Sequence, residues 1–205
     1  MRVFIAVPLS QAFKEALTDA CATLRGSRPG LRWTRPEGMH VTLAFLGDID
    51  ERGLQGAIMA SRSAVQGAAV AGMEASFTLS ARGLVTFPPR GPATVIAAGI
   101  GDGATQTVLL AEHVERELER VGVESGVPFR PRERRPFLPH ITLARANRPG
   151  VIIPASERAI PIMCSCSVDT ITIYRSSLDR AGARYEVLER IPLCGGQEEP
   201  GSSAR

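Results

Sequence analysis

The chain has 205 residues, which is enough for one domain, or for two small lobes, with a sizeable buried core. Its 44% hydrophobic and 22% charged residues are ordinary for a globular protein, and its net charge of +3 permits a polyanionic partner without requiring one. The four cysteines lack the spacing of a zinc site, and the first apolar run is too short for a membrane span or a secretory signal. We therefore expect reduced thiols in a cytoplasmic protein that has no membrane partner.

Hydrophobic periodicity and turn residues predict short strands interrupted by helices. The first strand covers residues 2–7, and Ser10 is placed to cap a helix that ends near residue 24. Asp50 is placed to cap a second helix that ends near residue 66, and a third helix covers about residues 104–121. The remaining strands are expected near residues 31–34, 40–47, 75–85, 93–98, 140–143, 168–175 and 184–193.

Several of these strands follow one another without a helix between them, which indicates antiparallel pairing. The expected fold class is therefore α+β rather than a doubly wound parallel sheet. We expect residues 1–193 to form a single domain with two lobes. Residues 194–205 are polar and rich in Gly, Ser and Glu, and they are expected to be a disordered tail.

One tetrad occurs twice in the chain. Residues 40–43 read HVTL and residues 140–143 read HITL, and the two tetrads hold two of the three histidines. Alternate side chains of a strand share a face, so the His and Thr of each tetrad should point one way. The aliphatic residues, and Phe45 after the first tetrad, should point the other way, into a core. The repetition also suggests two similar lobes with related sheets.

Two imidazoles and two hydroxyls suit the cleavage of a phosphate ester. Imidazole titrates near neutral pH, so His40 and His140 can act as an acid and a base. The hydroxyls of Thr42 and Thr142 can donate hydrogen bonds to phosphate oxygens. This scheme needs no cofactor and no metal ion, and no acidic cluster accompanies the histidines in the sequence. The third histidine, His113, falls on the polar side of the predicted third helix and is interpreted as a surface residue.

The tetrads and their surroundings resemble the two-histidine (2H) phosphoesterases. The similarity is greater to one branch, the RNA 2',3'-cyclic phosphodiesterases, also called 2'-5' RNA ligases. The matching stretches are RVFIA at 2–6, LRWTRPE at 31–37, HVTLAFLG at 40–47, PFLPHITLAR at 136–145, IYRS at 173–176 and ARYEVL at 183–188. They occur in order, so the resemblance covers residues 1 to about 193.

The resemblance implies two α+β lobes whose antiparallel sheets face a central cleft, with helices on the outer faces. It implies that His40 donates a proton to the leaving ribose oxygen, that His140 activates water, and that Thr42 and Thr142 hold the phosphate. The expected reaction opens a 2',3'-cyclic phosphate at an RNA end to leave a 2'-phosphomonoester. The same ring opening with a 5'-hydroxyl in place of water is 2'-5' RNA ligation, which is reversible and needs no ATP. RNA with such ends, tRNA fragments included, is the expected partner of a monomeric enzyme.

Arg145 matches a family arginine that contacts phosphate. Strict alternation places it on the face opposite His140, so it contributes to the site only if a bulge or a strong twist re-aims its side chain. The first tetrad is followed by Ala44, where relatives often have Lys. A basic loop precedes the second tetrad and either guides an RNA backbone or is simply solvated; its arginines are Arg130, Arg132, Arg134 and Arg135.

Two other functions stay open at this point. The chain can act on a small cyclic nucleotide or a nucleotide diester, because the catalytic residues would be the same and only the cleft walls would differ. It can also be a non-catalytic module that binds RNA ends, although a binder needs no acid–base pair. A metal site built from the two histidines is a weaker interpretation, because threonine is a poor ligand and no neighbouring Asp, Glu or Cys completes the set.

Overall fold

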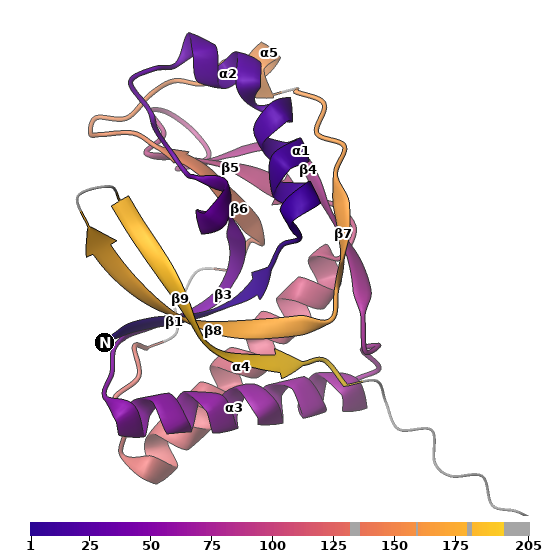
Figure 1. Ribbon diagram of the computed structural model, residues 1–205, viewed down its shortest axis with the longest axis vertical. Helices are drawn as coiled ribbons and strands as arrows, with labels where there is room; N and C mark the ends of the chain where they lie inside the picture. The colour runs from indigo at the N-terminus through magenta and orange to yellow at the C-terminus, as the bar shows by residue number, and fades with distance from the viewer. Residues whose placement is uncertain (132–135, 159, 180–181, 195–205) are drawn as a thin grey trace, which may run out of the picture.

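The computed structural model describes residues 1–131, 136–158, 160–179 and 182–194 (Figure 1). Its strands are β1 (Arg2–Pro8), β2 (Arg32–Trp33), β3 (His40–Asp48), β4 (Phe77–Phe87), β5 (Val95–Ile100), β6 (His140–Arg145), β7 (Ser165–Val168), β8 (Thr170–Asp179) and β9 (Gly182–Pro192). Its helices are α1 (Gln11–Ala20), α2 (Ala22–Ser27), α3 (Glu51–Val70), α4 (Ala104–Ser125) and α5 (Ala155–Arg158), with a 3-10 turn η1 (Pro36–Gly38). Of the predicted tail 194–205, all but Cys194 lies outside the described residues.

The strands form a curved antiparallel sheet in the order β7-β4-β5-β6-β3-β1-β8-β9, with the short β2 added to β6 (Figure 1). The two tetrad strands, β3 and β6, are neighbours near the middle of this order and pair at Val41 and Ile141. The halves of the sheet on either side of this pair are the two lobes. The α+β class with two antiparallel lobes is confirmed, and the lobes are joined through the tetrad strands themselves.

The apolar side of the tetrad strands is buried in a core that the helices share. Side chains of α1, α3 and α4 belong to this core together with the aliphatic tetrad residues. None of those tetrad residues is more than 3% exposed; they are Val41, Leu43, Ile141 and Leu143. In Figure 1, α3 and α4 lie together at one end of the molecule and α1 and α2 at the other end. No helix in the described part of the chain has the length and hydropathy needed to cross a bilayer.

Both predicted helix caps are present. Ser10 accepts a hydrogen bond from the Phe13 amide at 3.2 Å, and Asp50 accepts one from the Gly53 amide at 2.8 Å. Each bond satisfies a donor that a helix N-terminus leaves unpaired. The sequence pattern does not predict α2, η1, α5 and β7, because elements of three to six residues are too short to show a period.

The prediction that His113 lies on the surface is wrong. Its side chain is 9% exposed, because α4 packs closely against α3 and places the imidazole on Gly67. A Cβ atom added at Gly67 would lie only 2.7 Å from His113 Nδ1, so the glycine permits this close approach. Burial lowers the pKa of His113. The helical period of α4 predicted the residues of its central apolar stripe. It did not predict that α3 also covers residues beside this stripe, such as His113.

We expect His113→Ala to lower the free energy of unfolding by about 1–3 kcal/mol, because it leaves a cavity between α3 and α4. The lowered pKa means that the folded protein binds this proton less readily than the unfolded chain. The contribution of the neutral imidazole is therefore present above about pH 6.5 and is lost as the pH falls. Urea unfolding of both proteins at about pH 8 and about pH 5.5 measures the two effects. Equal stability at the higher pH would contradict the buried placement.

Candidate active site

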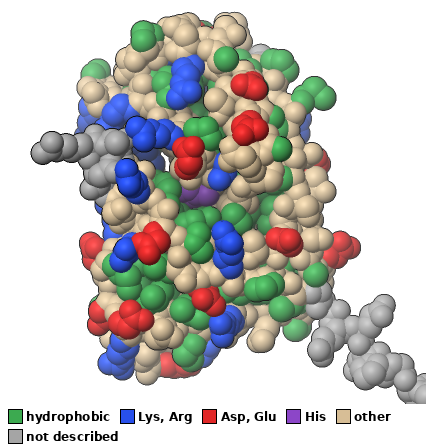
Figure 2. Space-filling model, viewed as in Figure 1, with side chains coloured by type: hydrophobic (Ala, Val, Ile, Leu, Met, Phe, Trp, Pro, Cys, Tyr) green, Lys and Arg blue, Asp and Glu red, His purple; other side chains and the backbone are tan. Residues whose placement is uncertain are grey.

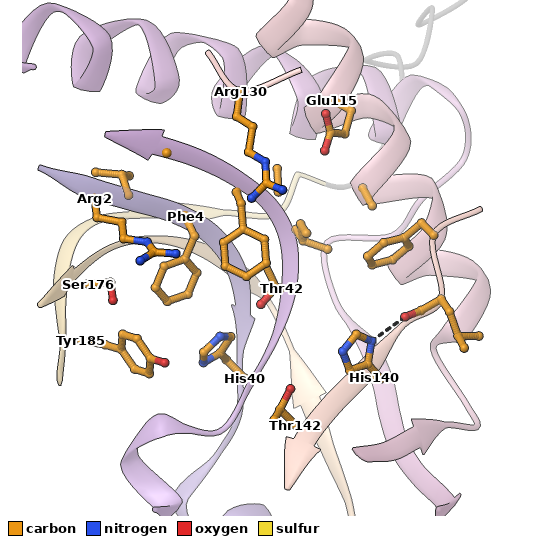
Figure 3. A pocket seen from close by; sticks show the side chains of 18 of the residues that line it. Arg2, Phe4, His40, Thr42, Glu115, Arg130, His140, Thr142, Ser176 and Tyr185 are labelled. Atoms are coloured by element: carbon orange, nitrogen blue, oxygen red, sulfur yellow. Dashed lines mark hydrogen bonds between the residues drawn. The ribbon is translucent and has the colours of Figure 1, made fainter. Parts of the chain in front are cut away.

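A cavity of about 630 Å³ brings the two tetrads together. His40 and Thr42 enter it from β3, and His140 and Thr142 enter it from β6. Figure 3 shows the two threonines between the two imidazoles, and Figure 2 shows a His side chain at the bottom of a hollow in the surface. Because β3 and β6 are neighbours in the sheet, residues far apart in the chain meet on rigid elements.

Each tetrad strand has a β-bulge at its leucine. Between Thr42 and Ala44, β3 has one more residue than β1 opposite to it, and Leu43 is this extra residue. On β6 the same shift occurs opposite β5, between Thr142 and Ala144. A bulge breaks the strict alternation of faces, so the side chains that follow it change sides.

The bulges turn the fifth residue after each histidine toward the cavity. Arg145 lines the cavity together with His140, which is the condition for its contact with a phosphate. Phe45 also lines the cavity and is 48% exposed, so the prediction that it points into the core is wrong. Ala44, which is 4% exposed, is the buried residue at this point of β3.

The backbone two residues before each histidine holds its imidazole. His140 Nδ1 lies 2.8 Å from the carbonyl oxygen of Leu138 (dashed line in Figure 3), and His40 has a hydrogen bond with the backbone of Gly38. When Nδ1 of His140 donates to the Leu138 carbonyl, Nε2 is the nitrogen left to exchange a proton with a ligand. The backbone just before each strand therefore orients the imidazole of that strand.

Aromatic rings pack on both imidazoles. The ring centroid of Phe4 lies 4.7 Å from that of His40, and Tyr185 meets the same imidazole edge-on at 5.2 Å. Phe87, at the end of β4, lies 4.6 Å from His140. The sequence pattern does not predict these three aromatic contacts, because each ring is far from its histidine in the chain. Only the strand order and register bring them there.

Burial lowers the pKa of both histidines. For His40, desolvation is the main cause, and the charges of Lys14, His140 and Arg145 add to it. The hydrogen bond with Gly38 opposes these effects, and the resulting pKa is about 4. For His140, desolvation is again the main cause, and Arg145 adds to it. Both imidazoles are therefore neutral at pH 7 in the protein alone, and a bound anion would favour protonation of either one.

The remaining wall carries charges of both signs. Arg2 and Arg130 contribute basic groups, and Glu112 and Glu115 contribute carboxylates from α4. Arg130 is thus part of the cavity wall rather than only of a solvated loop. The other arginines of that loop lie outside the described residues; they are Arg132, Arg134 and Arg135. Within the described ranges, no group of three or more His, Cys, Asp or Glu side chains is placed to hold a metal ion.

Comparisons with known proteins give one consistent result. The family model of LigT-like phosphoesterases matches residues 7–97. An RNA 2',3'-cyclic phosphodiesterase of Thermus thermophilus is 32% identical over 198 residues, which cover 95% of this chain and 91% of that protein. A crystal structure of a Thermus thermophilus protein matches with a TM-score of 0.75 at 31% identity, covering 96% of this chain and 100% of the other.

One relative is much longer than the present chain. The RNA 2',3'-cyclic phosphodiesterase of Geobacillus stearothermophilus is 31% identical over 194 residues, which cover 94% of this chain and 57% of that protein. The chain thus spans little more than half of this relative's length.

Proposed function

The chain belongs to the family of LigT-like phosphoesterases, and on that premise we propose that it hydrolyses the 2',3'-cyclic phosphate ends of RNA to 2'-phosphomonoesters. The observation that carries the proposal is the meeting of two imidazoles and two threonine hydroxyls in one cavity. The relatives in the comparison support the choice of substrate, because two of them are named RNA 2',3'-cyclic phosphodiesterases.

In the proposed reaction, His140 accepts a proton from a water molecule while the water oxygen attacks the phosphorus atom. The bond between phosphorus and the ribose O3' breaks, and His40 donates a proton to O3'. The products are a 2'-phosphomonoester and a 3'-hydroxyl. Because burial lowers the pKa of His40 to about 4, the negative charge of the bound phosphate has to raise this pKa for His40 to act as the acid.

Three further side chains hold the phosphate in this scheme. Thr42 and Thr142 donate hydrogen bonds to its non-bridging oxygens, where negative charge increases during the attack. Arg145 supplies a positive charge beside them. The positions of the threonines between the imidazoles, and of Arg145 in the same cavity wall, support these roles.

The experiment that tests the proposed function is the incubation of an RNA ending in a 2',3'-cyclic phosphate with the protein in EDTA. We expect complete conversion to a 2'-phosphate, because the two histidines, the two threonines and Arg145 supply the whole proposed mechanism. Digestion of the product and chromatography against 2'- and 3'-phosphate standards identifies the end. Activity that disappears with EDTA and returns with a divalent ion, or a 3'-phosphate product, would contradict the proposal.

The pH dependence should be bell-shaped, because one histidine must be neutral and the other protonated. For kcat/KM, which reports the free enzyme, the maximum should lie below about pH 6.5, since both histidine pKa values are lowered from that value. For kcat, the maximum should lie at a higher pH, because the bound phosphate anion raises both pKa values. Initial rates between about pH 4 and about pH 10 measure both profiles. A rate that rises steadily to the upper limit would contradict the histidine pair.

The same ring opening can also join two RNAs. If the 5'-hydroxyl of a second RNA replaces water, its oxygen attacks the phosphorus atom and O3' leaves, so the two RNAs are joined by a 2'-5' linkage without ATP. RNAs with cyclic ends, tRNA fragments included, are substrates of this kind. A mononucleotide 2',3'-cyclic phosphate in the same assay distinguishes an RNA enzyme from one that acts on small cyclic nucleotides. We also propose that the protein is a monomer in the cytoplasm, a compartment in which cysteines stay reduced.

A further inference from the structure

A second cavity of about 280 Å³ adjoins the first. Three arginines line it, Arg32, Arg145 and Arg148, together with the polar residues Thr94 and Asn147. No Asp or Glu among the described residues lines it. Arg145 lines both cavities, so this cavity lies beside the one that holds the histidines.

The arrangement of two of these arginines is unfavourable in the protein alone. Arg32 of β2 and Arg145 of β6 are direct cross-strand partners. Side chains paired in this way share a face of the sheet with their Cβ atoms about 4.5–5.5 Å apart, and like charges at this distance destabilise the pair. Among the described residues, none of the three arginines forms an ion pair, whereas nearby Arg28 pairs with Glu157 at 2.8 Å. An anion bound between them would remove the repulsion.

The covalent structure of RNA places a second phosphate next to the reacting one. The cyclic phosphate spans O2' and O3' of the last ribose, and the preceding phosphodiester is attached to O5' of the same ribose. Two phosphates thus flank one sugar, and a guanidinium between two cavities can contact both of them. We infer that the second cavity binds the phosphodiester immediately upstream of the cyclic end. This inference rests on the proposed function and extends it to the substrate's backbone.

A substrate that has the upstream phosphate should therefore be preferred. A nucleoside 2',3'-cyclic phosphate with a 5'-hydroxyl cannot fill the second cavity, whereas the same nucleoside with a 5'-phosphate can. The two compounds differ by one phosphate and share the same base, so base stacking contributes equally to both. Salt screens the attraction between these exposed arginines and a phosphate, so the preference should also decrease as salt increases.

The experiment compares kcat/KM for these two mononucleotides, and for a dinucleotide with a cyclic end, in the wild type, Arg32→Ala and Arg148→Ala. We expect the wild type to prefer both phosphate-bearing substrates. Each variant should lower this preference ratio by about tenfold, the scale of one lost charge-assisted contact. The matched control is Arg62→Ala, which removes the same charge from α3 at an exposed site outside both cavities and should keep the wild-type ratio.

The outcomes separate the inference from the proposed function. A wild type that hydrolyses none of the three substrates would refute both. Hydrolysis with the same preference ratio in the wild type, Arg32→Ala and Arg148→Ala would refute the inference alone. Preference for the dinucleotide without any gain from the 5'-phosphate would also overturn it, because the contact would then be with the upstream base or ribose.

Discussion

His40→Ala and His140→Ala should each lower kcat for an RNA cyclic phosphate by at least about a hundredfold, the usual scale for losing a positioned acid or base. The two imidazoles lie in one cavity with Thr42 and Thr142 between them, and each has a different role in the scheme, so neither can replace the other. Alanine at either position also removes a ring that packs on an aromatic neighbour, Phe4 or Phe87. Single-turnover reactions with labelled RNA, quenched at successive times, measure the chemical step directly.

The control for these variants is His113→Ala. It removes the third histidine, which is buried between α3 and α4 and lines neither cavity. Assayed below its unfolding temperature, this variant should keep a rate close to that of the wild type. A fully active His140→Ala would remove the paired-histidine mechanism altogether, and a His113→Ala as impaired as the other two would show that the losses reflect unfolding.

Thr42→Ala and Thr142→Ala should each lower kcat by about tenfold to a thousandfold, because each removes a hydrogen-bond donor to the phosphate. The loss is expected in kcat more than in KM, since the negative charge on the non-bridging oxygens increases in the transition state. Rates and KM values for both variants, measured with the same RNA, separate the two effects.

Serine provides the matched control at both threonine positions, because Thr→Ser keeps the hydroxyl and removes only a methyl group. Thr42→Ser and Thr142→Ser should recover most of the lost rate. Serine variants as slow as the alanine variants would contradict hydrogen bonding as the cause and would instead assign the methyl groups a packing role. Alanine variants with the wild-type rate would place the phosphate elsewhere in the cavity.

The features that the sequence predicted correctly are those that depend on neighbouring residues. The caps at Ser10 and Asp50 form local hydrogen bonds, and the tetrads have the alternation of a half-buried strand. Antiparallel pairing followed from consecutive strands without helices between them. The repeat of the tetrad then indicated two related lobes.

The errors arose where pairing or packing with a distant segment decides the outcome. The bulges at Leu43 and Leu143 arise from the pairing of these strands with β1 and β5. The assumption of strict alternation therefore misplaced Phe45 and could not decide whether Arg145 points into the site. His113 became buried because α3 packs on its side of α4. The aromatic residues around the imidazoles, and the pairing of β2 with β6, likewise depend on strands that are remote in the chain.

The division of labour between the histidines can be measured with a cyclic phosphate whose bridging 3'-oxygen is replaced by sulfur. A thiolate leaves without protonation far more readily than a ribose alkoxide, because a thiol has a pKa of about 8.5. If His40 is the acid and His140 the base, this substrate should restore most of the rate of His40→Ala relative to the wild type and leave His140→Ala slow. Equal rescue of the two variants, or selective rescue of His140→Ala, would contradict the assignment.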